Sequence, residues 1–172
     1  MTTLRLTIGI DPGISGAIAV LADGEAGPII DMPLLGEDRE VDARQVAMFI
    51  RAARDLHPGA SVSAVIERVR AMPPKDGERR AGAQSSFNFG DHYGKAKAVL
   101  ELLGIPYTRA EPASWKRQFG LTGQPKDASR VLAIQRFPTV AAELKRKKDN
   151  GRADALLIAL YGEQRLASGV AA

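Results

Sequence analysis

Residues 4–22 read LRLTIGIDPGISGAIAVLA, and this stretch does most to decide the fold class. Apolar residues alternate with other residues as far as Ile10, which predicts a strand that ends at Asp11. A Pro-Gly turn follows, and the apolar run of residues 16–22 predicts a second strand. Because the link is short, we expect the two strands to lie antiparallel.

The rest of the chain extends this pattern into an α/β domain. Asp42 is a plausible N-cap for the first helix, and the helix at 153–166 is apolar enough to be largely buried. We expect one domain over residues 1–172, with a five-stranded mixed sheet flanked by helices. The expected strands are 4–11, 16–22, 28–32, 62–66 and 105–108, and the expected helical segments follow Asp42 and occupy about 85–103, 112–119, 126–137, 140–147 and 153–166.

Composition excludes several kinds of site. The chain has 172 residues, of which 45% are apolar and 26% charged, as in one globular domain. It has no cysteine and only two histidines, which excludes thiol catalysis and leaves little for a zinc site, so oxygen atoms must hold any bound metal. The sequence has no bilayer-spanning run and no signal-peptide pattern, and we expect a cytoplasmic protein of a bacterial or phage-infected cell.

Charge is unevenly distributed along the chain. Residues 1–66 carry 5 Lys and Arg against 9 Asp and Glu, whereas residues 67–172 carry 19 against 11. A basic region of this kind favours a polyanionic partner such as nucleic acid, although a solvated basic surface is an equally common cause.

Three carboxylates adjoin apolar elements: Asp11 and Glu67 end predicted strands, and Asp154 lies at the start of the apolar last helix. A carboxylate beside a core needs a partner, which can be a basic side chain or a shared cation. Carboxylate oxygens favour Mg²⁺, with Mn²⁺ expected to substitute. Two such ions in one site suit phosphodiester hydrolysis. The strand-Asp-Gly-turn-strand pattern also occurs in actin-like and sugar-kinase ATPases, which are an alternative.

Five segments in order resemble one known family, the RuvC-type Holliday-junction resolvases, and especially their phage-borne relatives. The resemblance implies a ribonuclease-H-like fold, a homodimer, and Mg²⁺-dependent paired nicks in four-way DNA junctions. The segments are GIDPGISGAIAVL (9–21), AVIERVRAMP (64–73), SSFNFGDHYGKAKAVLELLGIPY (85–107), PASWKRQFGLTGQPKDASR (112–130) and GRADALLIALYG (151–162).

The resemblance also implies roles for individual residues. Asp11, Glu67 and Asp154 match metal-binding acids, and two lysines match residues near the scissile phosphate. The two phenylalanines of the segment at 85–107 match positions in a helix of the family that approaches the junction and the dimer partner. These lysines and aromatic residues are Lys116, Lys126, Phe87 and Phe89.

One position departs from the family pattern. An acid or His is expected three residues before the last Asp, but that position is Gly151. Asp149 is expected to supply the fourth ligand, with Asn150 as the alternative because it lies four residues before Asp154, on the same helical face. The departure also leaves open the alternative that the chain is a junction-binding protein that has lost catalysis.

Basic clusters near the acids are candidate phosphate contacts, with solubility as the alternative. We expect a mobile basic loop after Glu67 and a basic run before the last helix. The candidates are Arg68, Arg70, Lys75, Arg79, Arg80, Lys145, Lys147 and Lys148.

Overall fold

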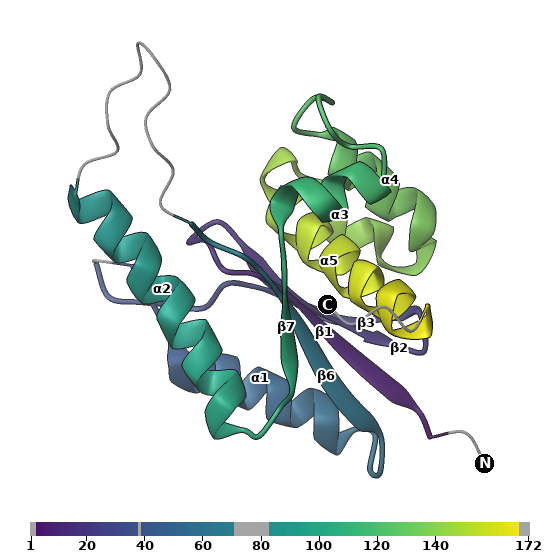
Figure 1. Cartoon of the computed structure of the whole chain (residues 1–172), viewed down its shortest axis with the longest axis horizontal. Coiled ribbons are helices and arrows are strands. Elements are labelled where there is room, and N and C mark those ends of the chain that lie inside the picture. The colour runs from purple at the N-terminus through teal and green to yellow at the C-terminus, as the bar shows by residue number, and fades with distance from the viewer. Residues whose placement is uncertain (1–2, 38, 71–82, 169–172) are drawn as a thin grey trace.

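The computed structural model describes residues 3–37, 39–70 and 83–168. Its centre is a five-stranded sheet in the order β3-β2-β1-β6-β7 (Figure 1). The β1-β2 and β2-β3 pairs are antiparallel, whereas β1-β6 and β6-β7 are parallel, so the sheet is mixed as predicted. The main elements are β1 (Arg5–Asp11), β2 (Ala17–Ala22), β3 (Glu25–Asp31), α1 (Ala43–Asp55), β6 (Ser61–Glu67), α2 (Ala83–Leu102), β7 (Tyr107–Ala110), α3 (Pro112–Gln118), α4 (Ala128–Arg136) and α5 (Asn150–Ala167).

The structure differs from the expected elements in three places. A small two-stranded sheet, β4 (Leu34–Leu35) and β5 (Glu40–Val41), was not predicted. The prediction of a helix at 140–147 is wrong, because Pro138–Leu144 and Lys147–Asp149 form two short 3₁₀ segments. The last helix begins at Asn150 rather than near residue 153.

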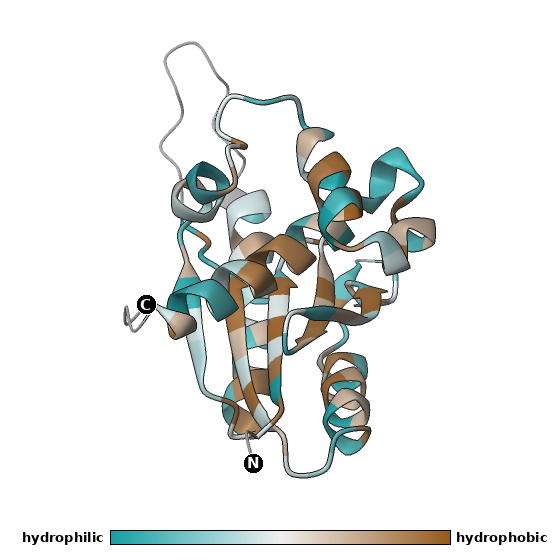
Figure 2. Cartoon of the chain, turned by 90° about the vertical axis from the view of Figure 1, so that its right-hand side faces the viewer, coloured by the Kyte–Doolittle hydropathy of each residue, from teal (hydrophilic) through white to brown (hydrophobic). Residues whose placement is uncertain are grey.

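Helices cover both faces of the sheet (Figure 1). Leu6, Ile8 and Ile10 of β1 face the layer of α1 and α2, whereas Ala17, Ala19 and Leu21 of β2 face α5. This alternation follows from the two-residue period of a strand. Figure 2 shows the strands rich in hydrophobic residues, which is why both faces need a cover. No helix in the described ranges is long and apolar enough to cross a membrane.

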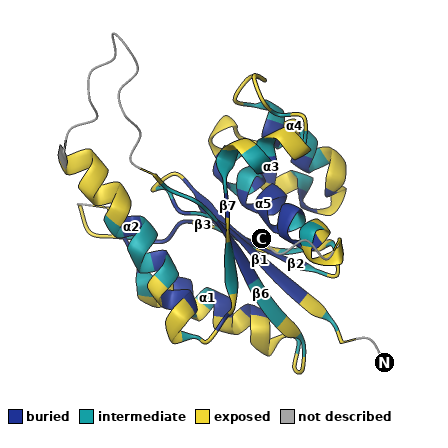
Figure 3. Ribbon diagram, viewed as in Figure 1, coloured by how far each residue is buried: buried dark blue, intermediate teal, exposed yellow. Residues whose placement is uncertain are grey.

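Capping and exposure define the two helices of the first layer. The predicted N-cap Asp42 accepts a hydrogen bond from the Gln45 backbone N–H at 3.0 Å, which fixes the start of α1. The second half of α2 packs on the sheet layer, where Ala96 and Leu100 are buried. The first half of α2 is exposed (Figure 3). This exposed half carries Phe89 toward the turn that follows β1.

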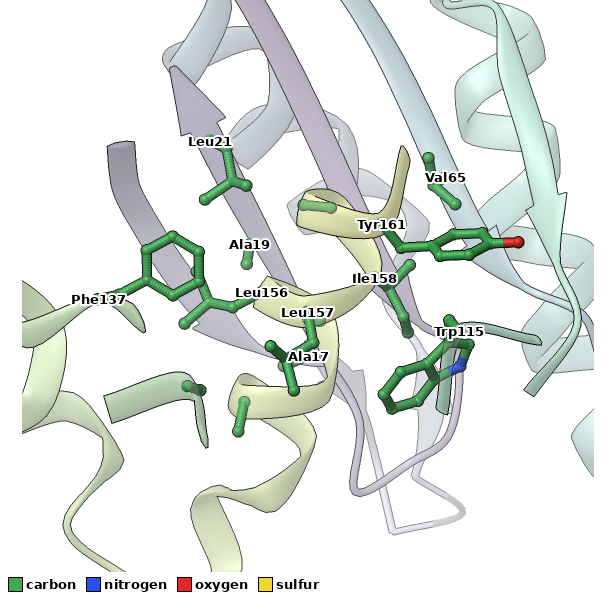
Figure 4. Close-up of a cluster of buried hydrophobic side chains, with 14 of the residues drawn as sticks. Ala17, Ala19, Leu21, Val65, Trp115, Phe137, Leu156, Leu157, Ile158 and Tyr161 are labelled. Atoms are coloured by element: carbon green, nitrogen blue, oxygen red, sulfur yellow. The ribbon is translucent and has the colours of Figure 1, made fainter. Parts of the chain in front are cut away.

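Small residues allow α5 to lie directly on the sheet. An ideal Cβ on Gly9 of β1 would lie 2.0 Å from the Ala155 carbonyl oxygen and 2.6 Å from the Ala159 backbone nitrogen. A Cβ on Gly151 would lie 2.3 Å from the Ser15 carbonyl oxygen. Backbone therefore meets backbone along one face of α5. Figure 4 shows the larger side chains of this layer, including Leu156 and Ile158, packed around that helix.

This packing predicts that Gly9→Ala destabilises the fold by about 1–3 kcal/mol, because backbone atoms must move to admit the methyl group. Gly90→Ala is the matched control, since Gly90 lies in α2 with nothing within 4 Å of its Cβ position. The control should be neutral or should stabilise the helix by about 0.5–1 kcal/mol. Urea unfolding of both variants measures the difference. Equal stability of the two variants would contradict the close approach.

Candidate active site

Asp11 and Glu67 lie side by side at one edge of the sheet. They end the parallel neighbours β1 and β6, whose register pairs Ile10 with Ile66. Since parallel strands end at the same edge, both carboxylates emerge there. The Asp11 Oδ1 atom accepts a long hydrogen bond from the Gly13 backbone N–H at 3.4 Å.

Two consecutive residues of α3 approach Glu67. The Trp115 indole N–H donates a hydrogen bond of 2.7 Å to the Glu67 Oε2 atom. The Lys116 ammonium lies 5.2 Å from the centre of the Trp115 ring. The positive charge of Lys116 acts to lower the pKa values of Asp11, Glu67 and Asp154. Lys116 is therefore near enough to all three predicted acids for its charge to stabilise their ionised forms.

The third acid, Asp154, comes from the first turns of α5. The Ser129 side chain of α4 hydrogen-bonds its carboxylate, and Lys126 contributes a favourable charge. The Asp154 Oδ1 atom is buried and has no hydrogen-bond partner among the described residues. The same holds for the Oδ1 atom of Asn150, one helical turn earlier. Two buried acceptor oxygens without donors are costly, which points to a missing positive partner.

The electrostatics of the three acids indicate one shared site. Burial, followed by the charges of Glu67 and Asp154, raises the pKa of Asp11 to about 7. Burial also raises the pKa values of Glu67 and Asp154. The carboxylates thus destabilise one another when all are ionised, and a cation would relieve that repulsion.

The donor chemistry fits a hard divalent cation. All candidate ligands are oxygen atoms, and two of them are the unpartnered buried oxygens of Asn150 and Asp154. In the described part of the chain, no group of three or more His, Cys, Asp or Glu side chains is arranged to hold an ion as it stands. Side chains would therefore have to draw together on binding. Mutual repulsion is the physical reason that carboxylates without a cation stay apart.

Asp149, the preferred fourth ligand, is instead tied to Arg146. Its Oδ2 atom accepts a hydrogen bond of 2.7 Å from the Arg146 backbone N–H, and its Oδ1 atom accepts one of 2.7 Å from the guanidinium. Although burial acts to raise it, these contacts hold the pKa of Asp149 below its usual range. Asn150 is thus the better placed of the two alternatives.

Gly151, the departure from the family pattern, has a packing reason. Because its Cβ position collides with the Ser15 backbone, no acid or His fits there without moving the turn after β1. Position 151 therefore supplies no ligand side chain.

The predicted DNA contacts fall into four groups, one of which lies outside the described residues. Arg68 and Arg70 both bind the Glu111 Oε1 atom, at 2.9 and 2.6 Å, so they lie together beside α3. Phe87 is 71% exposed and Phe89 43% exposed, both on the outer half of α2. The remaining described lysines are exposed, whereas part of the basic loop lies outside the described residues. The exposed lysines are Lys126, Lys145, Lys147 and Lys148. The predicted contacts outside the described residues are Lys75, Arg79 and Arg80.

A groove of about 920 Å³ lies beside the turn that follows Asp11. The turn residues Gly13 and Ser15 line one side, and Phe89 and His92 of α2 line the other. Phe89 approaches closely, since its Cε2 atom lies 3.9 Å from the Cβ position of Gly13. The groove joins the acid edge of the sheet to the exposed half of α2.

Sequence reasoning missed two side chains that support the acids. Nothing in the sequence pattern indicates that Trp115 is the donor to Glu67. Ser129, the partner of Asp154, was not singled out. The available signal was only that each lies near a predicted lysine, Lys116 or Lys126, in sequence.

The raised pKa of Asp11 predicts a pH dependence of stability in metal-free protein. Between pH 4 and 7 the folded state keeps a proton that the unfolded state has lost, so the free energy of unfolding should fall as pH rises through this range. Asp11→Asn removes the titrating group and should flatten the fall. Urea unfolding in a chelating buffer at several pH values measures both slopes. Equal slopes in wild type and variant would contradict the coupling.

Comparisons with known proteins support the fold. No family model matches the chain. Two solved structures of Thermus thermophilus RuvC align with TM-scores of 0.60 and 0.59, at 15% and 16% identity, and cover 97% and 96% of this chain. The alignments cover 98% and 97% of those chains, and the first is a complex with a Holliday junction substrate.

A sequence relative agrees with the structures. The Holliday junction resolvase MOC1, a chloroplastic protein of Chlamydomonas reinhardtii, is 29% identical over 152 residues. The match covers 76% of this chain but only 17% of the length of that relative. These comparisons favour the resolvase resemblance over the ATPase alternative. They confirm the predicted resemblance and show that this chain has the RuvC fold, which is ribonuclease-H-like.

Proposed function

We propose that the chain is a divalent-metal-dependent endonuclease that resolves four-way DNA junctions by paired nicks. The observation that carries the proposal is the meeting of Asp11, Glu67 and Asp154 at one edge of a RuvC fold, with raised pKa values. The T. thermophilus RuvC complex and the MOC1 relative supply the substrate class, a Holliday junction. We further propose that residues 1–172 act as one nuclease domain.

The proposed cofactor is Mg²⁺, with Mn²⁺ as a substitute and two ions in each site. Asp11, Glu67 and Asp154 would hold the ions, and Asn150 would add a neutral oxygen. When bound, such ions activate a water for attack on phosphorus and stabilise the leaving oxygen.

The other side chains of the site bind and orient the DNA. Lys116, whose charge acts on all three acids, would contact the scissile phosphate, and the exposed Lys126 would approach it from the side of Asp154. Lys116 also reduces the repulsion between the acids before DNA arrives. This role explains why a lysine lies beside the site rather than in bulk solvent.

Phosphate contacts away from the cut are proposed for the basic residues around the groove. Arg68 and Arg70 would exchange part of their pairing with Glu111 for DNA phosphates, at little cost because exposed ion pairs are weak. The run Lys145–Lys148 would hold a more distant part of the DNA backbone.

The location of the protein in the cytoplasm of a bacterial or phage-infected cell stays a prediction.

Paired nicks require paired sites, so we propose a two-fold homodimer. The exposed outer half of α2, with Phe87 and Phe89, is the proposed interface or junction contact. Light scattering of the purified chain measures the oligomeric state, and a monomer with full junction cleavage would contradict the dimer.

A second candidate function is junction binding without cleavage. It is favoured by Gly151, where packing leaves no room for the fourth ligand of the family pattern. Binding of a junction by the wild type with no nicking in Mg²⁺ or Mn²⁺ would select it.

Removal of any acid tests the endonuclease proposal. Asp11→Asn, Glu67→Gln and Asp154→Asn should each reduce junction nicking by about a thousandfold or more, because several kcal/mol of transition-state stabilisation is lost. Junction binding should persist, since removal of a negative charge does not weaken attraction to phosphates. Glu163→Gln is the matched control, because Glu163 is a buried acid of α5 that binds the Gly24 backbone instead. Nicking and binding are both measured with labelled four-way, forked and linear DNA. Full activity in an acid variant would overturn the assignment of the site.

The fourth ligand is tested by a pair of neighbouring variants. Asn150→Ala should raise the Mg²⁺ concentration needed for half-maximal activity by about tenfold or more. Asp149→Asn should instead lower stability by about 1.5–3 kcal/mol, through loss of the charged hydrogen bonds with Arg146, and leave the Mg²⁺ requirement near that of wild type. Magnesium titrations and thermal unfolding separate the two effects. The reverse pattern would assign the ligand to Asp149.

A further inference from the structure

Trp115 has an unusual combination of burial and polar contact. It is the single tryptophan of the chain and has no exposed surface. Figure 4 shows its ring beside Ile158 of α5, within the core layer. Its one polar atom nevertheless donates to Glu67, 48 residues away in sequence. The core of the domain and the candidate metal site therefore meet at one side chain.

The hydrogen bond has the properties of an orienting contact. Its length of 2.7 Å is typical of a bond to a charged acceptor. An indole has a single donor, whereas a carboxylate has about four acceptor positions, so Glu67 keeps acceptor capacity for a cation. Because the indole cannot move within the packed core, it restricts the orientations of the carboxylate.

We propose that Trp115 is a positioning residue that holds the Glu67 carboxylate in the orientation needed for the metal site. This inference rests on the proposed metal-dependent function. It assigns to the indole N–H a role beyond packing. The ring face also lies under the Lys116 ammonium, at 5.2 Å from the ring centre, but that contact does not depend on the N–H.

Simple packing is the competing explanation, since a buried tryptophan needs some acceptor for its N–H. In that case Glu67 satisfies Trp115, and metal binding does not depend on the bond. The two explanations differ in what happens when the N–H is removed with the ring left in place. Benzothienylalanine at position 115 makes this change, because sulfur replaces the N–H and the ring keeps its shape and its face toward Lys116.

The first measurement uses the single indole N–H signal in a ¹H–¹⁵N spectrum of DNA-free protein. Magnesium binding at Glu67 should move this signal, and Glu67→Gln should abolish the movement. Glu163→Gln, the buried acid at the Gly24 turn, should leave it unchanged. A signal that does not respond to Mg²⁺ in the wild type would overturn the inference, whether or not any variant folds.

The second measurement is junction cleavage by the benzothienylalanine protein. Its kcat should fall and its Mg²⁺ requirement should rise, each by about tenfold, with KM for the junction unchanged because Trp115 is buried away from DNA. Cleavage and Mg²⁺ requirement equal to wild type would leave the endonuclease proposal intact and overturn the positioning role.

Failure of the proposed function has a different signature. A wild-type protein that cleaves no DNA, but whose indole signal responds to Mg²⁺ only when Glu67 is present, would remove the endonuclease proposal. The positioning role would then be supported if benzothienylalanine at position 115 weakens the rise in thermal stability that Mg²⁺ produces, and overturned if that rise is unchanged.

Discussion

Close contact between the backbone of α5 and the sheet determines where the acids lie. At Gly9 and Gly151 there is no room for a side chain, because backbone atoms of the facing segment occupy the Cβ positions. This approach places Asp154 of α5 above the ends of β1 and β6. A larger residue at either glycine would lift the helix and separate Asp154 from the other two acids.

The same contact creates an electrostatic cost. Three carboxylates share a partly desolvated edge, and the pKa of Asp11 rises to about 7 as a result. The neighbouring groups offset part of this cost: Lys116 by its charge, Trp115 and Ser129 by hydrogen bonds. Two buried oxygens still have no donor in the described part of the chain. An ion at this edge would lower the free energy of the folded state, and so metal binding and stability should be linked.

Local patterns explain why much of the fold and part of the site could be predicted. The two-residue period of β1 placed Asp11 at a strand end, and the apolar run before Glu67 did the same for β6, so their parallel pairing brought them together. The 3₁₀ segments before α5 were missed because apolar spacing alone does not separate a short 3₁₀ turn from a helix.

Long-range contacts explain what could not be predicted. Nothing local in the sequence indicates that Trp115 reaches Glu67, or that Ser15 blocks a side chain at Gly151. The ion pair of Arg146 with Asp149 was also missed, although it is local, because a basic run next to an acid does not specify which partner the acid takes. Asp149 is expected from the sequence as a metal ligand, and the structure shows its buried carboxylate paired with Arg146.

The most direct test of the account is a crystal structure of the protein grown with Mn²⁺, with anomalous diffraction used to locate the metal. The account predicts an anomalous peak at the edge of the sheet, within ligand distance of Asp11, Glu67 and Asp154, with the Asn150 oxygen directed toward it. A peak bound by Asp149 with Arg146 displaced would contradict the assignment of the fourth ligand. The absence of any peak between the three acids, at a Mn²⁺ concentration that supports activity, would contradict the central claim.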